Sequence, residues 1–341
     1  MNRDERLPDF VGIGAQKAGT TWLGHNLQLH PDIWMPRNKE LHYFDDRIRD
    51  PRNPVSRLYR RITGKGHVNR RWRRQVKGRL RSHWNRHPGQ DLLWDLRYYA
   101  GAPGAGWYAA LFEPGRGKVK GEITPAYSTL PIEEVAHVHE VVPEAKIIFM
   151  LRNPIERAWS QFVMRLDRSG QRDLGLTRHR KLLRNVEREG SRSRTDYLHA
   201  LENWSAFYPQ ERIFVGFLED IHFYPAKLLG SVYDFLDVDP SFRPPGIGKK
   251  VHARSAGRMP SGSALYLARL YAQELSRLNE RFGGYASFWD YCAEKLSEGV
   301  PEEEHVPYPL WESAMWEEWT RADAERPGFQ SGPLLVAGWP R

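Results

Sequence analysis

The chain has 341 residues, of which 40% are apolar and 27% charged, and its mean hydropathy is −0.66. This composition is typical of a globular protein and excludes a mostly disordered or collagen-like chain. No stretch approaches the roughly 20 apolar residues that a membrane-spanning helix needs, and no apolar run follows the charged N-terminus, as a secretion signal would require. We therefore expect a cytoplasmic protein without a membrane span.

The first elements in the chain are an apolar run at 9–14, a glycine-containing loop, and a helical segment that ends near His30. Further strand-like runs cover 119–123, 146–151 and 213–217, and helical patterns cover 132–142, 154–168, 196–208 and 225–236. Alternating strands and helices predict an α/β fold of the P-loop type, in which helices flank both faces of a mainly parallel sheet. Ligands then bind at the carboxyl ends of the strands. We expect a single domain over 1–341 with its core at 8–289.

Two segments interrupt this alternation. Residues 45–106 are rich in Arg, Gly, Pro and Trp and are interpreted as a basic insertion over one end of the sheet, partly helical around 70–84. The tail at 300–341 contains six prolines and is interpreted as an irregular C-terminal extension with one helix near 311–323.

The net charge of +9 is distributed unevenly along the chain. Residues 47–87 hold 13 arginines and 2 lysines against one aspartate, a balance of +14, so the remaining residues sum to −5. Residues 298–325 carry nine acidic residues against Arg321. The basic block either is a solvated face partly neutralised by the acidic segment or attracts an anionic partner. Tryptophans within it resemble a polyanion surface, but no motif of a specific nucleic-acid reader accompanies them.

The lone cysteine, Cys292, excludes an internal disulfide and a thiolate metal cluster, and we expect it to be a buried apolar residue. The histidines show no metal-ligand spacing. His137 and His139 lie two apart on a predicted helix and point in different directions. We therefore predict no metal site.

The loop from Gly14 to Thr21 has two glycines five residues apart at a strand-to-helix junction. Backbone N–H groups and a helix N-terminus form an anion cradle in such a loop, and Lys17 adds a positive charge. The nucleotide P-loop requires a lysine directly after its second glycine, whereas Thr20 follows Gly19 here. An ATPase or kinase therefore fits poorly, and a glycine turn without a ligand remains the alternative.

This loop resembles the 5′-phosphosulfate loop of sulfotransferases, whose donor is 3′-phosphoadenosine-5′-phosphosulfate (PAPS). Residues 146–162, KIIFMLRNPIERAWSQF, resemble the 3′-phosphate motif of the same family. Arg152 ends a predicted strand and Ser160 lies about two turns into the next helix, so both can face one phosphate. The resemblance covers about 8–289 and is closest to the heparan-sulfate-type and bacterial branch.

The resemblance implies a set of donor-binding residues. They are Gln16, Lys17, Ala18, Gly19, Thr20, Thr21, Trp22, Arg152, Ser160, Lys249, Lys250 and Arg254. Trp22 corresponds to the tryptophan that stacks on adenine, with core packing as the alternative. The loop with the two later lysines would close over the 3′-phosphate. The resemblance implies no obligatory metal.

Two further segments resemble the heparan-type branch, namely NKELHYF at 38–44 and GEITPAY at 121–127. Ile123 stands where the family has a lysine, so a positive charge on the acceptor side must come from elsewhere or be absent. Glu40 corresponds to the proposed general base, for which we expect a raised pKa, with a surface glutamate paired with Lys39 as the alternative. His42 is the rival base, and Lys17 is expected to neutralise charge on the leaving phosphate.

The expected activity is transfer of a sulfuryl group from PAPS to a hydroxyl or amine, which leaves adenosine 3′,5′-bisphosphate (PAP). The expected acceptor is a small molecule or glycan, and we favour an anionic or carbohydrate one because of the basic insertion. The alternatives are a P-loop nucleotide kinase and a non-catalytic polyanion-binding protein with a degenerate donor site.

Overall fold

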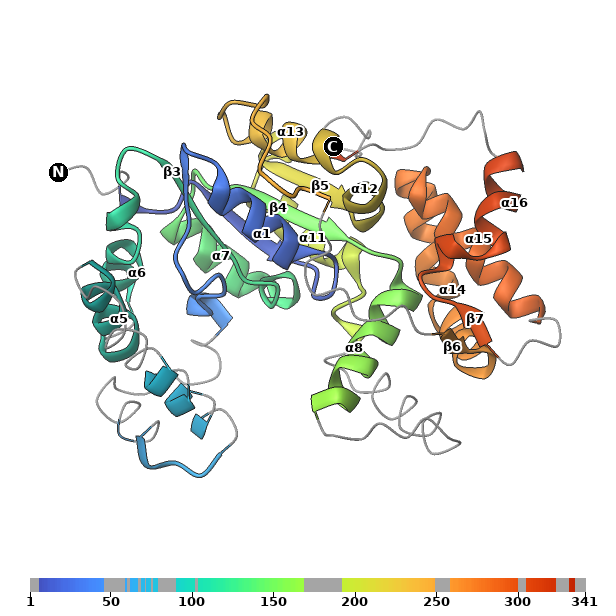
Figure 1. The fold of residues 1–341 in the computed structure, drawn as a ribbon, viewed down its shortest axis with the longest axis horizontal. Coiled ribbons are helices and arrows are strands. Elements are labelled where there is room, and N and C mark those ends of the chain that lie inside the picture. Colours follow the sequence, from blue (N-terminus) through green and yellow to red (C-terminus); the bar gives the residue numbers. More distant parts are fainter. Residues whose placement is uncertain are drawn as a thin grey trace.

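A six-stranded sheet in the order β2-β3-β1-β4-β5-β8 forms the centre of the computed structural model (Figure 1). The structure describes residues 6–45, 59, 62–66, 69–70, 72–74, 76–78, 90–101, 104–168, 192–248, 258–299, 305–322 and 331–334. The strands of this sheet are β1 (Phe10–Gly14), β2 (Ile33–Trp34), β3 (Val119–Ile123), β4 (Lys146–Leu151), β5 (Ile213–Phe217) and β8 (Gly332–Pro333).

The first five strands of the sheet are parallel, and β8 pairs with β5 antiparallel at one edge. In register, Val11 on β1 lies between Glu122 on β3 and Ile147 on β4. Every residue of β1 and β5 is buried, as expected for parallel strands covered on both faces. The predicted α/β class is confirmed, and β8 shows that the C-terminal extension supplies part of the sheet.

Helices flank the sheet, with α1 in front and α7 behind in Figure 1. The helices connecting its strands are α1 (Thr20–Leu29), α7 (Ile132–Val141), α8 (Pro154–Arg168), α11 (Tyr197–Ser205), α12 (Leu218–Phe223) and α13 (Pro225–Phe235). Short 3₁₀ turns are η2 (Glu113–Gly115), η3 (Tyr127–Thr129), η4 (Gln210–Arg212) and η5 (Leu310–Glu312).

The remaining elements lie at the two ends of the sheet (Figure 1). At one end are α5 (Gln90–Ala100) and α6 (Ala105–Ala110), and at the other are α14 (Ser261–Phe282), α15 (Tyr285–Glu298), α16 (Ala314–Ala322), β6 (Arg258–Pro260) and β7 (His305–Pro307). The two helices α5 and α6 were not predicted within the insertion. Of the predicted helix at 70–84, residues 70, 72–74 and 76–78 are helical, and the others lie outside the described residues.

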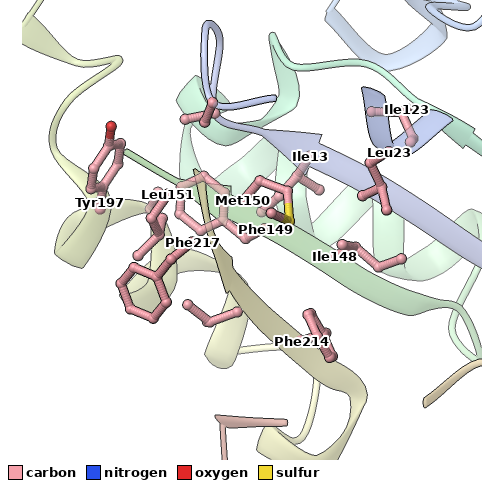
Figure 2. Packing of buried hydrophobic residues seen from close by; sticks show 14 of the residues in the cluster. Ile13, Leu23, Ile123, Ile148, Phe149, Met150, Leu151, Tyr197, Phe214 and Phe217 are labelled. Atoms are coloured by element: carbon pink, nitrogen blue, oxygen red, sulfur yellow. The ribbon is translucent and has the colours of Figure 1, made fainter. Parts of the chain in front are cut away.

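Branched and aromatic side chains of β1, β3, β4 and β5 interlock in the core, where Ile123 lies beside Leu23 of α1 (Figure 2). A Cβ added to Gly12 would come 2.6 Å from Cγ1 of Ile123, so the close approach of β1 and this side chain requires glycine. Cys292 is fully buried, as predicted. Within the described residues, none of the helices combines the length and the apolar character that crossing a membrane requires.

Candidate active site

The loop between β1 and α1 has the backbone geometry of an anion cradle. Gly19 precedes α1 with φ +80°, and a Cβ there would lie 2.3 Å from Cδ1 of Ile221, so this position needs glycine. Within the described chain, neither a capping side chain nor an acidic residue occupies the first turn of α1. The N–H groups of that turn, at the positive end of the helix dipole, can therefore bind an anion.

The second phosphate motif lies beside this loop because β4 is the neighbour of β1 in the sheet. The N–H of Ala15 donates to the carbonyl of Met150 on β4. Arg152, at the end of β4, donates from Nη1 to the carbonyl oxygen of Lys17 at 3.1 Å. The tertiary structure thus joins the two motifs that the sequence separates by 135 residues.

Arg152 is held by partners that the sequence did not suggest. Its Nη2 donates to Oε2 of Glu156 at 2.7 Å and to the hydroxyl of Tyr308 at 2.7 Å. Arg152 is 7% exposed and Glu156 is 1% exposed. A buried carboxylate therefore pairs with the guanidinium, so Arg152 is not an isolated charge. Ser160 lies one turn after Glu156 on α8 and is half-buried.

The remaining predicted donor residues occupy different environments. Gln16, Lys17 and Gly19 are half-buried, Ala18 and Thr20 are buried, and Thr21 is exposed.

Trp22 is 5% exposed, and its indole N–H donates to the carbonyl of Ile247 at 3.1 Å. The ring is therefore packed in the core in this structure, and stacking on adenine stays a prediction. Lys249, Lys250 and Arg254 lie outside the described residues.

Glu40, His42 and Asp45 form a carboxylate–imidazole–carboxylate chain. Nε2 of His42 lies 3.4 Å from Oε2 of Glu40, and its Nδ1 lies 3.0 Å from Oδ2 of Asp45. The two predicted bases meet where the backbone turns at His42, whose φ is +57°. The side chain of Glu40 remains 41% exposed, whereas that of Asp45 is 6% exposed.

The contacts among these three side chains shift the pKa values of Glu40 and His42 in opposite directions. Burial alone would lower the pKa of His42, but the hydrogen bonds to Asp45 and Glu40 raise that pKa to about 10. Burial alone would raise the pKa of Glu40, but the contacts with His42 and Lys39 outweigh it and the pKa lies below its ordinary value. The expectation of a raised pKa for Glu40 was therefore wrong. At neutral pH, Glu40 is an ionised acceptor and His42 is a cation.

The pair of Glu40 with Lys39, which was the alternative for Glu40, is present, and Lys39 also contacts Thr20 at the start of α1. Its Nζ lies 3.3 Å from Oγ1 of Thr20 and 3.5 Å from Oε1 of Glu40. Burial lowers the pKa of Lys39, and the nearby Glu40 partly opposes this effect. The ammonium thus lies between the phosphate loop and the candidate base. Its place next to Glu40 in the sequence was the available signal.

Lys39 lies next to Ile123, the position at which the resembling family has a lysine. A Cβ on Gly24 would meet the Cδ of Lys39 at 2.9 Å and Cδ1 of Ile123 at 3.5 Å. The N–H of Ile123 also donates to the carbonyl of Lys39 at 3.1 Å. Ile123 fills the core, and the aliphatic part of Lys39 crosses the same glycine of α1 while its ammonium reaches Thr20 and Glu40.

The second acceptor-side segment holds the loop that bears Glu40. The N–H of Leu41 donates to Oγ1 of Thr124 at 3.0 Å and to Oε2 of Glu122 at 3.2 Å. Glu122 is fully buried and also accepts hydrogen bonds from the hydroxyls of Tyr108 and Tyr127. Burial raises its pKa despite these bonds. The segment at 121–127 therefore positions the candidate base through its side chains.

In the part of the chain that the structure describes, no group of three or more His, Cys, Asp or Glu residues could hold a metal ion.

Comparison with known proteins shows the family that the chain resembles. The sequence model of the sulfotransferase family matches residues 8–242. Heparan sulfate glucosamine 3-O-sulfotransferase 6 of Mus musculus is 25% identical over 234 residues, which are 68% of this chain and 52% of that protein. The membrane-associated sulfotransferase kil1 of Dictyostelium discoideum is 28% identical over 160 residues, 46% of this chain and 22% of that protein. The chain therefore spans about half, or less, of the length of these curated relatives.

A solved structure shows a similar fold. The sulfotransferase from Alicyclobacillus acidocaldarius aligns over 80% of this chain and 94% of its own, with a TM-score of 0.53 and 23% identity. The family model matches most of the chain, and both phosphate motifs lie within the matched residues, so this chain is a member of the sulfotransferase family.

Proposed function

We propose that this chain transfers a sulfuryl group from PAPS to a hydroxyl or amine of an acceptor. The observation that carries the proposal is the bond from Arg152 to the carbonyl of Lys17, which places the two phosphate motifs at adjacent strand ends. An uncapped helix start at one motif and an arginine and a serine at the other fit a ligand with two separated phosphate groups.

The residues of the chain would divide the work of an in-line displacement. PAPS supplies the sulfuryl group and a phosphate leaving group. Lys17 and the N–H groups of the first turn of α1 would hold the 5′ end of the donor and stabilise charge on the phosphate. Glu40 would accept the proton of the acceptor, because its lowered pKa keeps it ionised at neutral pH. Lys39 would stabilise the sulfuryl oxygens from the acceptor side.

A carbohydrate acceptor is supported by the relatives named heparan sulfate glucosamine 3-O-sulfotransferase. An anionic acceptor is supported by the positive charge of the insertion, in which Arg70 and Arg74 are exposed. Arg73 is occupied locally, since it donates to the carbonyls of Ile62 and Gly64. The nucleotide kinase and the polyanion-binding protein have no comparable support in the family match.

The test is transfer of labelled sulfate from PAPS to a panel of sulfated glycans, desulfated glycans, phenols and amines. We expect product with the wild-type protein and a loss of at least 100-fold with either Lys17→Ala or Glu40→Gln. Binding of ATP with Mg²⁺ in place of PAP would indicate a kinase. Absence of transfer together with donor binding unaffected by Arg152→Ala would refute the proposal.

A further inference from the structure

Part of the C-terminal extension contacts the predicted 3′-phosphate motif, although it lies beyond the residues matched by the family model, 8–242. The strand β7 pairs antiparallel with β6, with Pro307 opposite Arg258 and His305 opposite Pro260. This pairing fixes the residues that follow β7 next to the start of α8. The hydroxyl of Tyr308 then meets Arg152 across 156 positions of sequence.

Three contacts join this segment to the motif. Nη2 of Arg152 donates to the hydroxyl of Tyr308 at 2.7 Å, and the guanidinium carbon lies 5.4 Å from the centre of the tyrosine ring. Glu156 uses both carboxylate oxygens, accepting from Arg152 on Oε2 and from the N–H of Leu310 on Oε1 at 2.7 Å. One buried carboxylate therefore connects the arginine of the motif with the backbone of the extension.

The chemistry of these groups limits how a phosphate can be bound there. Because Glu156 pairs with Arg152 at 2.7 Å, neutral hydrogen-bond donors beside the guanidinium can add to the binding of an anion there. The hydroxyl of Tyr308 accepts a hydrogen bond from Arg152, which leaves its own proton for another acceptor. Ser160 follows Glu156 by four residues on α8, so its hydroxyl lies on the helix face that the extension contacts.

We propose that Tyr308 is a donor-binding residue whose hydroxyl donates to the ribose 3′-phosphate of PAPS and PAP, so that the C-terminal extension completes the 3′-phosphate site. The inference rests on the proposed function, since it assumes this donor. It assigns Tyr308 a part in selecting a 3′-phosphorylated adenine nucleotide over one without that phosphate.

The experiment is a cycle of two proteins and two ligands. Binding of PAP and of adenosine 5′-phosphate, which differs by the 3′-phosphate alone, is measured by calorimetry for wild type and Tyr308→Phe. Phenylalanine keeps the ring over Arg152 and removes the hydroxyl. Tyr291→Phe, which removes a hydroxyl that donates to Glu318 on the exposed surface, is the matched control. The calorimetric stoichiometry reports the folded fraction of each variant.

We expect Tyr308→Phe to weaken PAP about 10-fold or more, as loss of a hydrogen bond to a charged group does, and to leave adenosine 5′-phosphate within about twofold. Tyr291→Phe should change neither ligand. If wild type prefers PAP and Tyr308→Phe keeps the full preference, the inference is overturned, and equal weakening of both ligands also overturns it by assigning Tyr308 a structural role. A wild type that binds both ligands equally overturns the proposed function itself.

Discussion

Replacing His42 by glutamine should shift the acid limb of the pH–rate profile to higher pH. In wild type, the acid limb reports protonation of Glu40, whose pKa is held below its ordinary value by contacts that include His42. Glutamine removes the positive charge and retains an amide that can donate to Asp45. Without the imidazolium, one of the two groups that oppose burial is lost and Lys39 remains, so the pKa of Glu40 rises and the carboxylate is protonated at a higher pH.

The size of the shift follows from the geometry. Nε2 of His42 and Oε2 of Glu40 are 3.4 Å apart. Unit charges about 4 Å apart interact by about 4 kcal/mol at an effective dielectric constant of 20 and by about 1 kcal/mol in water. Because the Glu40 side chain is 41% exposed, solvent screening favours the lower part of this range, about 1–2 kcal/mol. That energy corresponds to about one pH unit.

The assay is kcat/KM for transfer of labelled sulfate between about pH 4 and pH 10, which reports the ionisations of the free enzyme. His199→Gln is the control, because this side chain on α11 is 64% exposed. Circular dichroism at each pH separates loss of activity from unfolding.

Two results would refute the reasoning. If His42→Gln leaves the acid limb in place, His42 does not set the ionisation of Glu40. If the wild-type rate climbs from pH 7 toward pH 10, it follows the neutral form of His42, whose pKa is about 10, and the base is His42 and not Glu40.

Three further predictions concern neighbouring groups. Lys39→Met keeps the aliphatic contact over α1 and removes the ammonium, so single-turnover transfer should slow about 10- to 100-fold while the melting temperature changes little; an unchanged rate would exclude Lys39 from the reaction. Thr124→Val removes an acceptor for the N–H of Leu41, and kcat should fall about 10-fold without weaker PAP binding; a change in PAP affinity alone would contradict this. Burial raises the pKa of Glu219 to about 8, so its ionisation opposes folding as pH rises from about 4.5 through 8. Glu219→Gln, which retains an acceptor for the indole N–H of Trp289, should match wild type near pH 5 and exceed it by about 2–4 kcal/mol in unfolding free energy above pH 8, as measured by urea denaturation; equal pH dependence of both proteins would contradict the assignment.

Local patterns predicted the strands and helices of the sheet closely. The runs at 119–123, 146–151 and 213–217 are strands with those same bounds. The last two are short, largely apolar segments, as buried parallel strands usually are, whereas 119–123 also buries Lys120 and Glu122. The glycine spacing likewise predicted the loop before α1, since a positive φ and a close approach at Gly19 depend on that residue type. The helix α5 was missed because the surrounding Arg, Gly, Pro and Trp residues obscured its pattern.

The protonation states and partners of the site residues were decided by the tertiary structure. The pKa of Glu40 is lowered in part because a turn at His42 brings the imidazole against its carboxylate, and the charge on that imidazole depends on Asp45. Arg152 is paired with Glu156 and capped by Tyr308, whose approach depends on pairing between β6 and β7. Sequence spacing reports residues that share one element, whereas charge balance depends on which distant elements pack together, and only the folded chain determines that.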